Sequence, residues 1–266
     1  MTAEPQSATG PIERIPARRR FRPGVELLLV LGLSLGASAV YSVLSFLDDL
    51  TRGPLSGQTT TLNPRQNARP LFDLIYQVLG NAFPLVPVLL ALYLLATPAL
   101  SGARRIGLDL DRPRFDLGLG VLLFAAIGVP GIGLYFAARG LGMNLAVQTS
   151  GIGAEWYAIP VLVLSAARAA LQEEVIVVGF LTERLRDLRR RPWLILTASA
   201  LLRGSYHLYQ GVGGFVGNAI MGFVFALLYR RFGRVGPLVV AHFLLDLASF
   251  VGVAVLDALA PGLLPR

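Results

Sequence analysis

The chain has 266 residues, of which 54% are hydrophobic and only 15% are charged, and its mean hydropathy is +0.62. A soluble domain carries about a quarter charged residues, so this composition excludes an ordinary soluble protein and indicates a polytopic membrane protein. The net charge of +8 reflects arginines that gather in the first 22 residues and in short loops, as topology determinants do, which argues against a nucleic-acid-binding surface. There is no cysteine, which excludes disulfides, cysteine-ligated metals and thiol nucleophiles.

Taken in order, the chain starts with a polar, arginine-rich tail over residues 1–22, which we expect to be disordered and to face the cytosol. After the tail, apolar segments of about 20 residues, the length that crosses a bilayer, predict seven spanning helices. Pro84 and Pro87 are expected to kink the second helix, and the Gly-Val-Pro-Gly sequence at 128–131 to bend or break the third. The seven helices are expected at about 25–46, 71–96, 117–138, 156–185, 193–209, 215–229 and 238–259.

The basic residues predict how these helices are oriented. They are densest in the tail and in the loops after the second, fourth and sixth helices, while the loops after the third and fifth hold almost none. By the positive-inside rule, the N-terminus is cytosolic and the C-terminus lies outside, although the first loop holds Arg52, Arg65 and Arg69. The sixth segment is short, and a re-entrant piece would change the count. The predicted fold is an all-α transmembrane helix bundle of seven or eight spans in the cell membrane, with a single membrane domain over 23–266.

Polar side chains interrupt three of the apolar segments. An ionisable residue costs at least a few kcal/mol in hydrocarbon, so such residues face the protein interior or water and usually serve a function. Singly, each cluster is readily explained as a structural bond between helices, whereas their recurrence on three helices favours one shared site. The chain's only histidines are among them. The clusters are Arg168 with Gln172, Glu173 and Glu174, then Arg203 with His207, and finally His242 with Asp246.

Helix geometry limits how these residues can meet. Adjacent residues point about 100° apart, so Glu173 and Glu174 cannot share a face: one should line a cavity and the other should find a partner. Glu173 and His207 each lie about 17 residues, or roughly 25 Å, from the turn at 190–191, which places them at matching depth in an antiparallel hairpin. His242 joins them at that depth only if the fourth and fifth helices extend into the cytosol.

This set of residue types suits water activation. A buried glutamate can act as general base on water, a histidine can orient that water, pass on its proton or bind a metal, and a second histidine can stabilise an oxyanion. The motifs of other intramembrane proteases, HExxH, GxGD and GxSG, do not occur in the sequence. A proton relay or transporter could use Glu173, Glu174 and His207 as well, but the sequence shows no inverted repeat of the kind that transporters commonly have.

Residues 164–250 resemble the CPBP family, which contains the CAAX proteases and bacteriocin-processing enzymes. The family pattern is EExxxRG on one helix, FxxxH on the next and HxxxN or HxxxD on a later one. The resemblance implies a multi-helix membrane endopeptidase, glutamic or metal-dependent, with its core at about 156–259. The matching residues are Glu173, Glu174 and Gly179 for the first motif, His207 for the second, and His242 with Asp246 for the third.

The resemblance also implies roles for these residues. Glu173 would be the general base, His207 its partner and Glu174 a supporting group, while His242 and Asp246 would stabilise the tetrahedral intermediate. A divalent metal such as zinc, held by Glu173, His207 and His242, is one option, and metal-free activation of water is the other. The implied substrate is a membrane-associated peptide or protein, and eukaryotic members of the family trim prenylated CAAX proteins.

Two positions depart from the family pattern: Val178 stands where the family has arginine, and Arg203 where it has phenylalanine. Val178 is four residues from Glu174, so an arginine there would be that carboxylate's local partner. We expect the cation to have moved, with Arg203 reaching across to pair with Glu174. Asp246 in place of asparagine lacks an amide donor, which favours a role in orienting His242 or holding a cation. These departures also support an alternative, a catalytically silent relative that binds a partner or a lipidated peptide.

Overall fold

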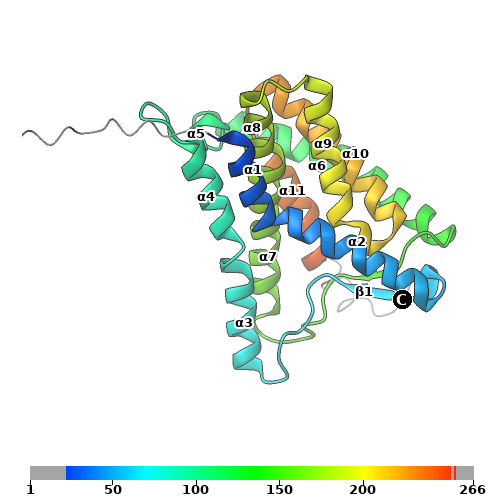
Figure 1. The fold of residues 1–266 in the computed structure, drawn as a ribbon. Coiled ribbons are helices and arrows are strands. Elements are labelled where there is room, and N and C mark those ends of the chain that lie inside the picture. Colours follow the sequence, from blue (N-terminus) through cyan, green and yellow to red (C-terminus); the bar gives the residue numbers. More distant parts are fainter. Residues whose placement is uncertain (1–21, 253–254, 256–266) are drawn as a thin grey trace, which may run out of the picture.

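The structure is a computed structural model that describes residues 22–252 and residue 255 (Figure 1). Within these residues the regular structure is helical apart from one pair of three-residue strands, which confirms the predicted all-α class. The tail predicted at 1–22 lies outside the described residues except for Arg22, and the end of the helix predicted at 238–259 also lies outside them.

The first apolar segment forms two helices, α1 (Pro23–Gly32) and α2 (Leu35–Arg52), which meet at an angle of 50°. At the bend the Ser34 hydroxyl donates to the Val30 carbonyl at 2.6 Å. In a continuous α-helix, this carbonyl would accept from the backbone N–H of Ser34 instead. The single helix expected over 25–46 is therefore broken, and α2 runs obliquely away from α1 (Figure 1).

The second apolar segment contains α3 (Pro70–Ala82) and α4 (Leu85–Leu95), which together make an apolar stretch of 26 residues. The two helices separate at Phe83 and Pro84, and the Pro84 nitrogen has no hydrogen to donate to a helical bond. The break lies where a kink is expected at Pro84, whereas Pro87 lies inside α4 and a kink there stays a prediction.

After the short helix α5 (Gly102–Arg105), α6 (Pro113–Gly140) runs for 28 residues with Pro130 inside it. The helix is continuous at 128–131, so a break there is wrong, and a bend at this sequence stays a prediction. Transmembrane helices tolerate internal proline where neighbouring helices or local adjustments satisfy the freed carbonyl.

Two loops at one end of the bundle are joined by a small sheet that the sequence does not predict. Strand β1 (Thr59–Thr61), which follows η1 (Leu55–Gly57), pairs in parallel with β2 (Ala146–Gln148). Thr59 is opposite Ala146 in the register. The sheet holds the loop after α2 against the loop after α6.

The segment that carries the two glutamates is one rod made of α7 (Ala158–Glu173), the π-helix η2 (Glu174–Phe180) and α8 (Leu181–Asp187). The π-helix begins at Glu174, immediately after Glu173. Its hydrogen bonds run from i to i+5 instead of from i to i+4. Val178 lies within this π-helix and is buried in the apolar core.

The remaining helices are α9 (Pro192–Tyr206), η3 (Leu208–Gln210), α10 (Val212–Phe232), α11 (Gly236–Leu247) and the π-helix η4 (Ala248–Gly252). The helix predicted as short is α10, which has 21 residues and is long enough to cross a bilayer.

Three stretches of the described residues are long and apolar enough to span a membrane: 70–95, 113–140 and 212–232. The bent pair α1 and α2 makes a fourth if it is one span. Other helices are shorter or carry the charged residues discussed below, so the predicted seven spans and cytosolic N-terminus stay predictions.

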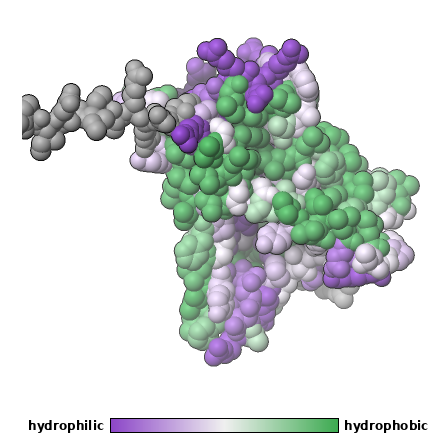
Figure 2. Space-filling model, viewed as in Figure 1, coloured by the Kyte–Doolittle hydropathy of each residue, from purple (hydrophilic) through white to green (hydrophobic). Residues whose placement is uncertain are grey.

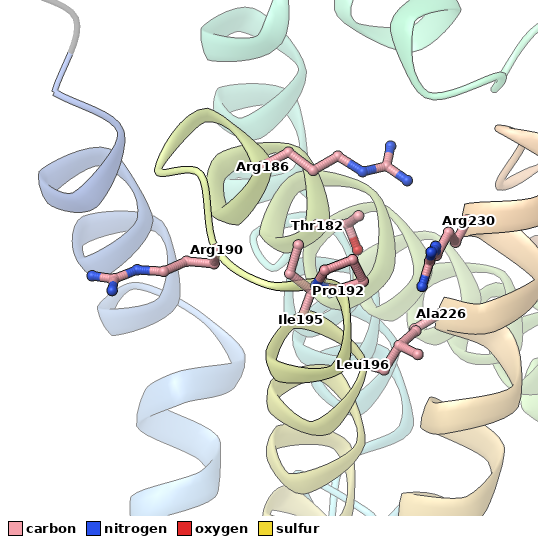
Figure 3. Close-up of a pocket in the computed structure, with 8 residues that line it drawn as sticks. All are labelled: Thr182, Arg186, Arg190, Pro192, Ile195, Leu196, Ala226 and Arg230. Atoms are coloured by element: carbon pink, nitrogen blue, oxygen red, sulfur yellow. The ribbon is translucent and has the colours of Figure 1, made fainter.

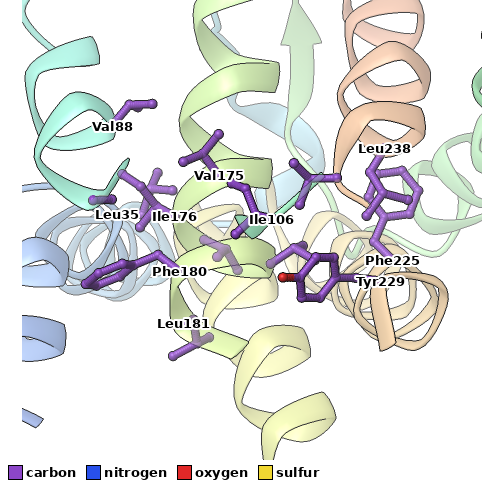
Figure 4. Packing of buried hydrophobic residues seen from close by; sticks show 14 of the residues in the cluster. Leu35, Val88, Ile106, Val175, Ile176, Phe180, Leu181, Phe225, Tyr229 and Leu238 are labelled. Carbon is purple, nitrogen blue, oxygen red and sulfur yellow. The ribbon is translucent and has the colours of Figure 1, made fainter. Parts of the chain in front are cut away.

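The apolar core surrounds the π-helix. Residues 175–178 and Phe180 are fully buried, and Phe225 and Tyr229 of α10 pack in the same cluster (Figure 4). The exterior is also apolar: Leu28 and Leu122 are 73% and 63% exposed. Figure 2 shows apolar residues over much of one face, with hydrophilic residues both at the end that carries the α8–α9 turn and at the opposite end. An apolar core inside an apolar surface is what a membrane protein requires.

Candidate active site

Arg203 of α9 lies where side chains from α7, η2 and α11 converge. Its Nη2 forms an ion pair with Glu174 Oε1, lies 3.3 Å from Glu173 Oε2 and lies 3.4 Å from His242 Nδ1. The expected cross-helix pair of Arg203 and Glu174 is therefore present. Figure 1 shows the rod containing α7 and α8 between α4 and α9, with α11 behind it, which is how three separated segments reach one point.

Glu174 is the sealed member of the glutamate pair. Its side chain is 0% exposed, and Oε1 takes both the Arg203 ion pair and a contact of 2.7 Å with His242 Nδ1. Oε2 is buried and accepts no hydrogen bond from the described residues. The Glu174 carboxylate is therefore buried and paired through one oxygen.

Glu173 is the open member. Its Oε2 accepts from the Tyr206 hydroxyl at 2.8 Å and from Arg203. Its Oε1 has no hydrogen-bond donor among the described residues. This oxygen is not one of the fully buried unpaired atoms, and the side chain is 11% exposed, so Oε1 is accessible to solvent. Glu174 has the buried partner that is expected of one glutamate, and the expectation that the other faces a cavity stays a prediction for Glu173.

His242 lies between carboxylates. Its Nδ1 is 2.7 Å from Glu174 Oε1, and its Nε2 is 3.5 Å from Asp246 Oδ2 and 3.9 Å from Glu173 Oε2. Since a carboxylate only accepts, Nδ1 carries a hydrogen and donates it to Glu174. Asp246, one turn further along α11, holds the other edge of the ring, so it is placed to orient His242.

His207 occupies the end of α9, whereas the sequence predicts a position inside the helix. Its Nδ1 lies 3.0 Å from the Arg203 carbonyl oxygen, which can only accept, so Nδ1 carries a hydrogen and Nε2 of the neutral ring is left as an acceptor. Tyr206 packs against the ring, with 4.7 Å between centroids. His207 interacts electrostatically with Glu173, but no hydrogen bond joins the two in the described structure.

Arg168, predicted to support the site, contacts different partners. Its Nη1 donates to Gln172 Oε1 at 3.3 Å and its Nε to Asn81 Oδ1 at 3.4 Å, so it ties α7 to α3. Tyr206 takes a place at the carboxylates that sequence reasoning did not assign. The available signal is its spacing of three residues from Arg203, which puts both side chains on one face of α9.

The arrangement does not fit the zinc site considered for Glu173, His207 and His242. Among residues 22–252, no group of three or more histidine, aspartate or glutamate side chains is placed to hold a metal ion. Instead, the Arg203 guanidinium lies at the convergence of Glu173, Glu174 and His242. The positive charge at this point comes from the chain itself, and no step below is routed through a metal.

Inside a helical bundle with apolar surfaces, a partly open glutamate therefore lies beside histidine and arginine, an arrangement that suits the activation of water. A family model, Type II CAAX prenyl endopeptidase Rce1-like, matches residues 155–248, about a third of the chain, and includes both glutamates and both histidines. Over this segment the chain is similar to the CAAX intramembrane proteases, which are peptide hydrolases. No curated protein and no solved structure matches the chain.

Proposed function

We propose that this protein is an intramembrane endopeptidase that hydrolyses a peptide bond of a membrane-associated substrate with water activated by Glu173. The observation that carries the proposal is the asymmetry of the Glu173 carboxylate: Oε2 is fixed by Tyr206 and Arg203, whereas Oε1 is open. A base held through one oxygen and free at the other can accept a proton from a water molecule in a defined position.

In the proposed reaction, Glu173 Oε1 takes a proton from water as the water oxygen bonds to the substrate carbonyl carbon. His207, with Nε2 available as an acceptor, orients that water. The tetrahedral intermediate then collapses, the C–N bond breaks, and the proton held by Glu173 passes to the leaving amine. His242 is the candidate donor to the oxyanion, since its contact with Asp246 is long, 3.5 Å, and leaves Nε2–H able to turn toward a stronger acceptor.

The family supports a class of substrate. CAAX proteases act on prenylated proteins at the membrane, so we propose a lipidated or otherwise membrane-associated polypeptide as the substrate of this chain. We further propose a multi-pass topology in the cell membrane with a cytosolic N-terminus, supported by the positions of the arginines.

The test is cleavage of a fluorogenic prenylated peptide by purified protein in liposomes. Glu173→Ala and His207→Ala should each abolish cleavage while the protein keeps its helical content and elutes as before. Retained cleavage in either variant overturns the proposal.

A second candidate, a catalytically silent relative that binds a partner or a lipidated peptide, is favoured by the Arg203 guanidinium, which occupies the point between both glutamates. A wild-type protein that binds the prenylated peptide without cleaving it supports this candidate.

A further inference from the structure

A small cavity of about 90 Å³ opens between α8, α9 and α10, at the end of the molecule that carries the arginine-rich α8–α9 turn (Figure 3). It is separate from the glutamate site and shares no residue with it. Its lining combines basic and apolar side chains: Thr182, Arg186, Arg190, Pro192, Ile195, Leu196, Ala226 and Arg230.

The basic side chains are not all neutralised by the protein. Arg186 pairs with Glu183 at 2.7 Å, but Arg190 and Arg230 form no ion pair among the described residues. In Figure 3 the Arg230 side chain faces the cavity from α10 and Arg186 extends over its mouth, whereas the Arg190 guanidinium points away. The cavity therefore presents positive charge that a bound anion would compensate.

The strongest evidence for a bound ligand is the unpaired hydroxyl of Thr182. This residue is only 2% exposed, and its hydroxyl oxygen is buried without a hydrogen-bond partner in the described part of the chain. Threonine hydroxyls in helices usually bond to a carbonyl one turn earlier, and a buried hydroxyl left unpaired is costly. An acceptor atom delivered into the cavity would pair it.

The surroundings identify the kind of anion. Pro192, Ile195, Leu196 and Ala226 give the cavity an apolar wall. Trp193, which follows Pro192, is 60% exposed, as expected of a tryptophan at a membrane interface. A cavity with basic side chains on one side and an apolar wall on the other fits an amphiphile with an anionic head group better than a free ion.

We propose that this cavity binds the phosphate group of an anionic phospholipid. Arg230 and Arg186 donate charge-assisted hydrogen bonds to the phosphate oxygens, and the Thr182 hydroxyl donates to one of them. The acyl chains lie along the apolar surface of α9 and α10. This inference is independent of the proposed proteolysis.

The test uses purified, delipidated full-length protein and measures binding of phosphatidylglycerol in nanodiscs or by native mass spectrometry, with phosphatidylcholine as the zwitterionic comparison. Arg230→Gln should weaken phosphatidylglycerol binding about fivefold. Arg231→Gln is the matched control, because it removes the same charge from the next residue, which does not line the cavity. Thr182→Val keeps the shape and the charge and should also weaken binding several-fold.

Two results would overturn the proposal. One is an equal loss in the Arg230 and Arg231 variants together with no effect of Thr182→Val, which means that general surface charge attracts the lipid. The other is inorganic phosphate competing as well as the phospholipid at equal concentration, which means that the cavity recognises a free anion and not a lipid. Loss of binding in the Arg230 and Thr182 variants alone supports it.

Discussion

Arg203 and Glu174 form an ion pair in which neither side chain is exposed to solvent. A buried pair is weak evidence for stability by itself, because both ions lose their hydration. Removing one partner is destabilising, because the remaining charge stays buried without an opposite charge to compensate it. The pair joins α9 to the π-helix η2, and Arg203 also contacts Glu173, the proposed general base.

Arg203→Met should therefore destabilise the protein by about 3–5 kcal/mol, because Glu174 is left buried and uncompensated. Thermal unfolding in detergent measures the effect, with Arg231→Met, which also removes an arginine charge from the chain, as the control. The double variant Arg203→Met with Glu174→Gln should recover part of the loss. A single Arg203 variant as stable as the wild type contradicts the structural role.

Substitutions of Glu173 and Glu174 should have different effects, one on catalysis and the other on stability. Glu173→Gln is expected to lower kcat for peptide cleavage about 10²–10⁴-fold while changing the unfolding temperature little, because it removes the base and keeps the shape. Glu174→Gln should mainly lower the unfolding temperature, because it weakens the buried network. Parallel cleavage assays and melting curves test this, and the reverse pattern means that the roles are exchanged.

Cleavage should not depend on an added metal ion, because the Arg203 guanidinium lies next to Glu173 and His242, two of the three candidate ligands. Protein treated with a chelator and then dialysed should cleave the prenylated peptide at the untreated rate. Elemental analysis should find well below one equivalent of zinc per chain. One equivalent of zinc that disappears in His207→Ala, together with loss of activity on chelation, contradicts this prediction.

A second ion pair predicts the response of stability to acid. A hydrogen bond of 2.8 Å from Arg234 holds the pKa of Asp109, in the loop before α6, below its usual range. Between the lowered folded pKa and the unfolded value of about 3.9, the unfolded chain binds more protons. The contribution of Asp109 is therefore present above pH 4 and is lost as the pH falls through the folded pKa.

Asp109→Asn should lower stability at pH 7 and flatten the loss of stability on acidification, measured as the free energy of unfolding between pH 7 and pH 3. Asp111→Asn on the same loop is the control. If the Asp109 variant loses stability on acidification as steeply as the wild type, this carboxylate does not carry the effect.

Much of the site could be predicted from the sequence, because charge inside an apolar segment is a strong signal. The recurrence of acidic and imidazole groups on three segments indicated a shared site, and Arg203 was expected to replace a cation missing near Glu174. The open and sealed positions of Glu173 and Glu174 follow from helix geometry, although which residue takes which place does not.

Other features depend on tertiary context that the sequence does not reveal. The sequence predicts an ordinary α-helix at residues 174–180, where the structure has a π-helix with hydrogen bonds from i to i+5. His207 ends α9 rather than lying within it, and Ser34 breaks the first helix by bonding to Val30. Continuity of α6 through Pro130 likewise depends on what surrounds the proline.

The parallel pairing of Thr59 with Ala146 joins positions 87 residues apart in the chain. The chain from α3 to α6 lies between the two strands, and contacts of such long sequence separation form slowly because the intervening loop must close first. We therefore expect this strand pairing to form late in folding, after the helices that lie between the two strands.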